Sequence, residues 1–391
     1  MNTDYLFPGR EDLFRLKVKN TESLKAEIMT VKDGIILPHL YGHNDSGGVC
    51  DAERKFLQES LCRGEYIKRG GEYGLTISAK LQGGGGGYST EKALFLGYFV
   101  KHWGHFLIDG IGRFWILCNE EYRNHKVIFL TDEFTRLSGS YLELFRYLGV
   151  DESRLISIRK PTRFDEIIIP STGYNAHGNY SPEHKRMLQQ VIQSSGACSI
   201  DTPRKIYLTR THFKDARMKE VGEKNIEQIF ANNGWAVMSP EKLSLREQIA
   251  IFQNAEEVAC VNGTIPLNVI FARPGLKLIV LNKTRFQHGN LQRFSCMAGI
   301  DPVYVDAYYE PFRGIPDSLG GGPFWMVISD CMKKYFADNN MNFDASLGGV
   351  NIAGWIGYLM RLFRVKLRGT KFWLLLRFIK RTVKKAVAKL S

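Results

Sequence analysis

The strongest constraint on the fold is an alternation of short apolar runs with helical segments, which occurs twice along the chain. The apolar runs have the length of buried strands, and the segments between them have helical spacing. Strands that alternate with helices pair in parallel within one sheet, and the helices pack on its faces. The sequence therefore predicts an α/β protein with two successive doubly wound units.

The two series have clear boundaries. In the first we expect strands at Ala93–Val100, Lys126–Leu130, Leu155–Ile158 and Asp165–Ile169, with helices at 103–119, 141–148 and 181–194. In the second we expect strands at Arg204–Arg210, Gly234–Met238, Glu257–Val261 and Leu276–Leu281, with helices at 225–233, 244–253 and 266–271. Residues 1–90 read as an irregular, β-rich entry, and Ser195–Pro203 reads as a linker. We therefore place one domain at 1–195, a second at 200–345 and a tail at 350–391.

Charge is unevenly distributed along the 391 residues. The net charge is +13, yet no acidic residue follows Asp344, while eleven basic residues do. The rest of the chain is nearly neutral, which argues against a uniformly basic nucleic-acid binder. The seven cysteines are scattered without a C-x-x-C pair, as in free thiols of a reducing compartment. With no secretory signal visible at the N-terminus, we expect a cytoplasmic protein.

The tail has the pattern of a helix that lies in a membrane interface. Its apolar residues share one helical face: Phe372, Leu375, Leu376, Ile379, Val383, Val387 and Leu390. Most of the basic residues fall away from that face, and Trp355 and Trp373 suit the headgroup layer. We expect residues 355–391 to bind an anionic membrane surface, on the inner face of the cell membrane. The alternatives are a helix packed on the body of the protein and a homodimer contact.

Three segments carry candidate chemistry. The first follows a strand, and in it His105 and Asp109 share one helix face. A carboxylate beside an imidazole suits a general base that takes a proton from a hydroxyl. The two side chains could equally just satisfy each other.

The second segment supplies cations where a strand of the second unit ends. Arg210 and Arg217 stand there, and guanidinium groups match phosphate oxygens bidentately. A solvated basic loop is the alternative. The third segment, Asn262-Gly263-Thr264, ends another strand, and Gly263 would let the backbone approach a diphosphate closely.

Three further residues stand within plausible reach of a ribose or base bound at that loop. They are Glu247, Gln248 and Asn268, although Asn268 could instead tie the loop to its own helix. The chain has no Asp-x-Asp motif and no His/Cys cluster with metal-ligand spacing. We therefore expect no metal and no cofactor, so that protein cations meet the charge of a leaving phosphate.

Residues 93–282 resemble the family 61 glycosyltransferases. The likeness lies in Trp103–Asp109 and in an ordered set of later segments: 205–210, Arg217, 235–241, 244–248, 262–264 and 268–271. The resemblance implies a GT-B fold, with two Rossmann-like domains facing a cleft, and sugar transfer from a nucleotide donor with inversion and without metal. Bacterial members often build capsular or lipopolysaccharide glycans.

The family pattern also implies roles for individual residues. Asp109 is the base candidate with His105 beside it, and His102 and Trp103 lie on the acceptor side. Arg210 and Arg217 are phosphate partners, and Asn262-Gly263-Thr264 is the donor loop. The family usually has His where Asn262 stands, and commonly Asn where His102 stands.

The sequence thus predicts an inverting, metal-independent glycosyltransferase with a lipid-linked saccharide acceptor. Two alternatives stay open. One is a pyruvyl or phosphoryl transferase that acts on the same kind of glycan, and the other is a non-catalytic scaffold recruited to membranes by the tail. The five glycines Gly83–Gly87 lack the G-x-G-x-x-G spacing of a nucleotide loop and read as a mobile hairpin or linker.

Overall fold

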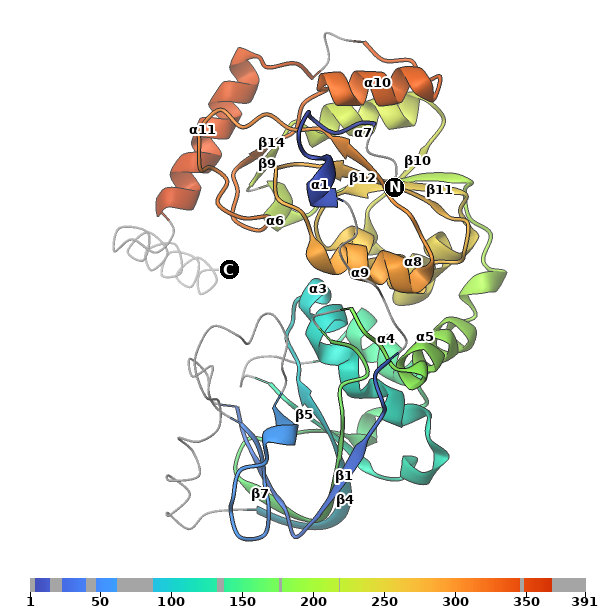
Figure 1. Cartoon of the computed structure of the whole chain (residues 1–391), viewed down its shortest axis with the longest axis vertical. Helices are drawn as coiled ribbons and strands as arrows, with labels where there is room; N and C mark the ends of the chain where they lie inside the picture. The colour runs from blue at the N-terminus through green and yellow to red at the C-terminus, as the bar shows by residue number, and fades with distance from the viewer. Residues whose placement is uncertain are drawn as a thin grey trace, which may run out of the picture.

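The chain forms two αβ units that stack along its long axis (Figure 1). The structure is a computed structural model that describes residues 4–14, 23–39, 47–61, 87–131, 137–175, 178–217, 219–344 and 348–367, without the side chains of Asp215 and Arg217. Of the glycine run, Gly83–Gly86 lies outside these residues and Gly87 begins a strand.

The first unit is built on a mixed sheet of seven strands. The strands are β1 (Ile28–Lys32), β2 (Ile35–Leu37), β3 (Gly48–Cys50), β4 (Gly87–Tyr98), β5 (Lys126–Leu130), β6 (Leu155–Ser157) and β7 (Thr162–Pro170). Their order is β3-β2-β7-β4-β5-β6, with β1 also on β7. The four predicted strands β4 to β7 pair in parallel, whereas β1 and β2 run antiparallel to β7.

Helices in the first unit gather on one face of the sheet, which corrects the doubly wound prediction for this unit. That face, with Leu94 and Phe129, packs on α4 (Ser140–Tyr147), α5 (Pro182–Ser195) and the helical segment 103–118. On the opposite face, the described residues that surround Phe95 come from strands and the loops beside them. In the described residues between 23 and 61, the strands β1, β2 and β3 therefore extend the sheet instead of supplying a helical layer.

The second unit is a doubly wound parallel sheet, as predicted. It contains β8 (Lys205–Leu208), β10 (Ala236–Met238), β11 (Glu257–Val261), β12 (Lys277–Asn282) and β13 (Val303–Asp306), in the order β10-β8-β11-β12-β13. On one face lie α7 (Glu223–Asn232) and α10 (Asp330–Asp338). On the other lie α8 (Leu245–Asn254), the 3-10 helix η9 (Ile265–Phe271) and α9 (Gly289–Ala298). Strand β13, α9 and α10 follow the last strand that the sequence predicted.

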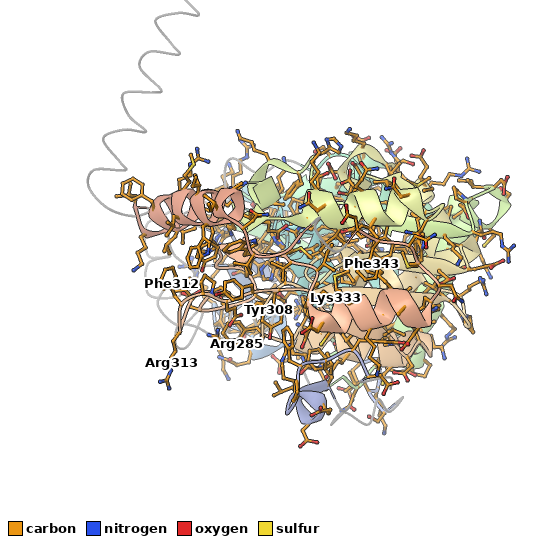
Figure 2. All side chains as sticks on the ribbon, turned by 90° about the horizontal axis from the view of Figure 1, so that it is seen from above. Arg285, Tyr308, Phe312, Arg313, Lys333 and Phe343 are labelled. Carbon is orange, nitrogen blue, oxygen red and sulfur yellow. The ribbon has the colours of Figure 1, made fainter. Side chains whose placement is uncertain are left out.

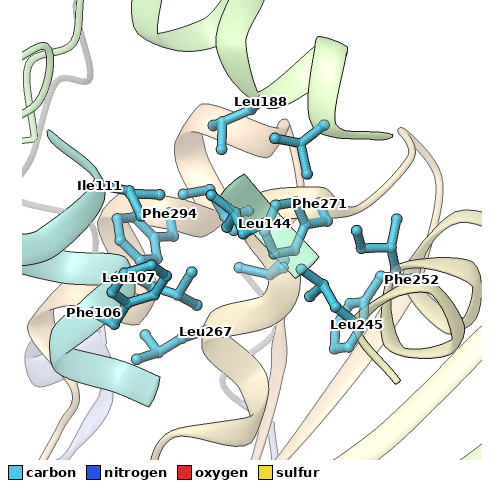
Figure 3. Packing of buried hydrophobic residues seen from close by; sticks show 14 of the residues in the cluster. Phe106, Leu107, Ile111, Leu144, Leu188, Leu245, Phe252, Leu267, Phe271 and Phe294 are labelled. Carbon is cyan, nitrogen blue, oxygen red and sulfur yellow. The ribbon is translucent and has the colours of Figure 1, made fainter. Parts of the chain in front are cut away.

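A continuous apolar core joins the two units, so the space between them is not simply an open cleft. In Figure 3, Phe106, Leu107, Ile111, Leu144 and Leu188 of the first unit gather with Leu245, Phe252, Leu267, Phe271 and Phe294 of the second. The backbone N–H of Leu245, at the start of α8, also donates to Glu143 Oε2 on α4 at 2.9 Å. Burial of these apolar side chains stabilises the contact between the two units.

Residues 4–14 correct the predicted boundary of the first domain, because they pack on the second unit. This segment ends in α1 (Glu11–Phe14), where the ring of Phe14 lies 4.6 Å from the ring of Tyr304 on β13. The backbone N–H of Phe7 donates to Asp306 Oδ2 at 2.8 Å, and Arg10 forms an ion pair with the same carboxylate. The side chain of Asp306 is fully buried at the end of β13, so these partners compensate its charge.

The described part of the tail is one helix, α11 (Ile352–Leu367), which packs on the body of the second unit. It lies on a small parallel sheet of β9 (Glu220–Val221) and β14 (Phe324–Trp325). Tyr358 is buried there, and the ring of Trp355 stands 5.4 Å from that of Trp325. The prediction of Trp355 as a headgroup residue is therefore corrected. The ring of Phe312 lies 6.0 Å from that of Trp355, on the side of the second unit that α11 covers (Figure 2).

The predicted amphipathic face at residues 372–390 lies outside the described residues. Within the described ranges, no helix has the length and apolar character needed to cross a membrane.

Candidate functional site

The strand order of the second sheet places a ligand crevice between β8 and β11. Numbered along the chain, the five strands run 2-1-3-4-5, so the connections from the first and third strands leave on opposite sides. In sheets of this type ligands bind at the carboxyl ends of those two strands. Arg210 follows β8 and Gly263 follows β11. The structure therefore brings two of the predicted donor residues to the switch point.

Arg210 and Gly263 lie directly against each other. Gly263 has a φ of +153°, and a Cβ built on it would stand 2.8 Å from Arg210 Nη1. A residue with a side chain would displace the guanidinium from this position, and its backbone would be strained at this φ. The backbone N–H of Arg210 donates to Glu223 Oε1 at 2.8 Å, which fixes the turn after β8.

A buried ion pair, which the sequence did not predict, supports Arg210. Lys283 Nζ lies 2.5 Å from Glu220 Oε1, and Arg210 Nη2 lies 3.3 Å from the same oxygen. Burial alone would raise the pKa of Glu220, but the charges of Lys283 and Arg210 outweigh it and the pKa is lowered. Burial lowers the pKa of Lys283 to about 8. Lys283 could have been found, because it directly follows the end of a predicted strand, whereas no periodicity marked Glu220.

Glu223 is a second buried carboxyl group in this cluster, and it behaves differently. Burial, together with the nearby negative charge of Glu220, raises its pKa to about 8. At neutral pH Glu223 is therefore mostly protonated. It leaves Glu220 as the main negative charge beside Arg210.

Arg210, Glu220 and Glu223 of this cluster line a cavity of about 230 Å³. Its walls are Arg210, Thr211, Ala216, Glu220, Val221, Gly222, Glu223, Lys224 and Arg361. Sites for whole small ligands usually measure ~300–1,000 Å³. The cavity therefore fits the charged end of a ligand better than an entire nucleotide sugar.

On the first unit, His105 and Asp109 meet as their spacing predicted. His105 Nδ1 lies 3.6 Å from Asp109 Oδ2, and the side chains are 33% and 7% exposed. A single α-helical turn, α3 (Trp103–His105), precedes a π-helical turn, η3 (Phe106–Gly110), which carries Asp109. π-Helical turns are rare in proteins, and those that do occur are often found at functional sites. Both carboxylate oxygens of Asp109 are buried without a hydrogen bond from a described residue.

Contacts between α3 and η9 hold the two halves of the site together. Trp103 Nε1 donates to Asn268 Oδ1 at 2.7 Å, and Asn268 Nδ2 donates to Gln248 Oε1 at 3.1 Å. A Cβ on Gly104 would stand 3.3 Å from the side chain of Thr264. Asn268, which was predicted to contact the donor, is thus buried and hydrogen-bonded between the two units. The indole N–H of Trp103 is used in the same hydrogen bond.

His102 connects the two halves electrostatically. It caps α3, and its Nδ1 accepts from the backbone N–H of His105 at 3.4 Å. Burial lowers the pKa of His102, and the charges of His105, Arg210 and Lys219 lower it further. Burial and the cations on the second unit therefore favour the neutral form of the His102 imidazole.

The remaining predicted residues are Glu247, Asn262 and Arg217, and their surroundings in the structure differ. The carboxylate of Glu247 caps α8, where it accepts from Ser244 N at 2.8 Å and from Ser244 Oγ at 2.7 Å. We therefore do not propose Glu247 as a donor-binding residue. Asn262 is fully buried at the end of β11, and its Nδ2 donates to Asn282 Oδ1 at 2.9 Å. Arg217 ends the short helix α6 (Lys214–Arg217), but its side chain lies outside the described structure.

No group of three or more His, Cys, Asp or Glu side chains among the described residues is placed to hold a metal ion. Metal independence remains a prediction from the sequence.

Comparison with known proteins identifies one family. The model of the family described as Glycosyltransferase 61 matches residues 103–279. The match begins at α3 and ends within β12, so it spans both units and includes His105, Asp109, Arg210 and the 262–264 loop. A search of curated proteins gave no match.

Proposed function

Because residues 103–279 form a glycosyltransferase family 61 region, we propose that this protein transfers a sugar from a nucleotide-sugar donor to a hydroxyl group of a glycan. One observation carries the proposal. The Arg210–Gly263 contact lies at the ligand crevice of the second sheet, and α3, which begins the His105–Asp109 segment, packs against the loop that follows β11. A phosphate-binding cation and a proton acceptor are the two groups that this reaction requires from the protein.

On the donor side, the diphosphate of the nucleotide sugar binds at the cavity beside Arg210. Its guanidinium stabilises the negative charge that develops on the leaving phosphate oxygen. Lys283 neutralises Glu220, which would otherwise repel the donor from the same place. Gly263 keeps the space beside the guanidinium open.

On the acceptor side, the glycan hydroxyl loses its proton to the His105–Asp109 pair. The hydroxyl oxygen attacks the anomeric carbon while the bond from that carbon to the phosphate oxygen breaks, so one displacement inverts the configuration. His105 is the more exposed member and Asp109 is buried. We therefore assign the contact with the acceptor to His105 and the orientation of its imidazole to Asp109, which differs from the sequence-based choice of Asp109 as the base.

The two units correspond to the two lobes of a GT-B enzyme in this proposal. The first unit meets the acceptor and the second meets the donor. The acceptor that we favour is a lipid-linked saccharide of bacterial surface polysaccharide synthesis, because such an acceptor lies at the cytoplasmic face of a membrane.

Exposed apolar residues on α11 support that choice of acceptor. Ile352, Ile356, Met360 and Phe363 are exposed at helical spacing, with Ile352 80% and Phe363 65% exposed. We name these four residues the α11 stripe. The 24 residues that follow α11 include eight basic and no acidic residues, so the chain continues as a cationic segment suited to anionic lipid.

Donor screening tests the proposed activity. Uridine, guanosine and cytidine nucleotide sugars are offered to the full chain, and binding is measured by calorimetry and by a shift in the thermal unfolding midpoint. We expect one nucleotide class to bind and phosphoenolpyruvate not to bind. Binding of phosphoenolpyruvate alone would favour a pyruvyl transferase, and binding of none of these compounds would favour a scaffold.

Sedimentation with vesicles tests the membrane surface. The variant Ile356→Asp/Phe363→Asp should lose binding to vesicles that contain anionic phosphatidylglycerol, and wild-type binding should weaken as salt rises. Leu13→Asp, a matched change at an exposed apolar residue on α1, should leave sedimentation unchanged. Equal binding by wild type and the double variant would remove the α11 stripe from the proposal.

A further inference from the structure

The helix α11 reaches the candidate donor cavity, although it lies beyond the family match. The match ends at residue 279, whereas α11 spans Ile352–Leu367. Tyr358 anchors the helix in a cluster with Trp325 and Val327. A Cβ on Gly354 would stand 2.3 Å from the Trp325 ring, so the helix packs too closely there for any larger residue. One side of α11 is thus fixed against the sheet that contains Glu220.

Arg361 stands on that fixed side, one turn after Tyr358, and lines the same cavity as Arg210. Its Nη1 donates to the backbone carbonyl of Gly357 at 3.0 Å, which directs the guanidinium along the helix surface. Burial lowers the pKa of Arg361, the charge of Arg364 lowers it further, and the charge of Glu220 raises it. Arg361 is therefore a partly desolvated cation within the field of the Arg210 cluster.

The charges around the cavity favour an anion. Arg210, Lys224 and Arg361 contribute three cations to its walls. Of the two carboxyl groups there, Glu220 is already bound by Lys283 at 2.5 Å, and Glu223 is mostly protonated at neutral pH. Two guanidiniums from separate elements can bind the two phosphates of a diphosphate, each through paired N–H donors.

We propose that Arg361 binds the donor diphosphate together with Arg210, so that α11 completes the donor site. This inference rests on the proposed function, because it assigns the cavity to the donor. It also gives α11 two tasks, since Arg361 faces the cavity while the α11 stripe remains exposed.

Calorimetric titration of the full chain with inorganic pyrophosphate and with nucleoside diphosphates tests the inference. Arg361→Ala should weaken binding of both about tenfold, and Arg361→Lys should fall between that variant and wild type because a lysine binds one oxygen at a time. Arg364→Ala removes the same charge from the exposed side of α11 and should change the affinity less than about twofold. Thermal unfolding midpoints show whether each variant is folded.

The failures are distinguishable. If Arg210→Ala loses binding and folded Arg361→Ala binds as wild type does, the inference is overturned and the proposed function stands. Equal losses in Arg361→Ala and Arg364→Ala would also overturn it, because they would reflect general charge. If wild type binds neither pyrophosphate nor any nucleoside diphosphate, the proposed donor site and the role of Arg361 both fail.

Discussion

The His105–Asp109 pair on the first unit stands in one irregular helical turn, whereas Arg210, Glu220 and Lys283 on the second unit come from three segments around one sheet. The pair is held by local spacing and by the packing of α3 on η9. The cluster is held by a parallel sheet with helices on both faces and by a buried ion pair. The difference indicates that the cavity proposed for the donor is supported by a larger part of the fold than the proposed reacting pair, which depends on a short segment.

The largest effect is expected for the reacting pair. His105→Ala and Asp109→Asn should each lower kcat by about 10²–10⁴-fold, because general base catalysis is worth roughly that much. The Kd for the donor should stay within about twofold of wild type, since neither residue lines the donor cavity. Product formation is followed by chromatography and donor binding by calorimetry. A normal rate in both variants would remove the pair from catalysis.

Arg210→Ala should show the opposite pattern. We expect the Kd for the donor to rise about 10–100-fold, because a hydrogen-bonded charge pair contributes on the order of 1.5–3 kcal/mol. Arg204→Ala is the matched control, since Arg204 stands at the other end of the same strand and forms an exposed ion pair with Glu256. Calorimetry on both variants checks the prediction. Similar affinities for the two variants would place the donor elsewhere.

Gly263→Ala should weaken donor binding about tenfold, a smaller effect than that of Arg210→Ala. The new Cβ would push against Arg210 Nη1, and the φ of +153° would be strained. Gly234→Ala is the control, because Gly234 also has a positive φ, of +78°, but no atom lies within 4 Å of the place where its Cβ would stand. Both variants should lose stability, and only Gly263→Ala should lose affinity. An unchanged affinity in Gly263→Ala would separate this loop from the donor.

The smallest effect concerns the pH dependence of the cluster. Glu223 titrates at about 8 in the folded chain and near 4.5 when unfolded, so between these values only the folded chain holds the proton. The free energy of unfolding should therefore fall as pH rises from about 5 to 8. Glu223→Gln mimics the protonated form and should lack this decline. The fall in the free energy of unfolding between pH 5 and pH 8 should therefore be larger in wild type than in the variant by more than about 1.4 kcal/mol, which corresponds to one pKa unit. Urea unfolding at pH 5, 6.5 and 8 measures the difference, and parallel curves would show that Glu223 titrates normally.

The two units also differ in how much the sequence could predict. The strands of the second unit alternate with helices, so their strand ends, and with them Arg210 and Gly263, followed from periodicity. Residues 1–60 carry weak periodicity, and so neither their pairing with β7 nor the packing of 4–14 on the second sheet was predicted. Long-range contacts such as Phe7 with Asp306 leave no local pattern.

The candidate site shows the same limit. The i, i+4 spacing predicted that His105 and Asp109 meet, but not that a π turn would bury the carboxylate. Glu247 was expected at the donor, yet its carboxylate already accepts from the backbone N–H of Ser244 at the start of α8. Arg361 was counted only as part of a basic tail, because nothing local to it indicates contact with a strand 140 residues earlier.

A crystal structure of the full chain with a bound nucleoside diphosphate tests the division between the two units most directly. We expect its phosphate oxygens within hydrogen-bonding distance of the Arg210 guanidinium and beside Gly263, with the terminal phosphate, which carries the sugar in the intact donor, directed towards His105. A diphosphate bound away from β8 and β11, or on the first unit, would contradict the account.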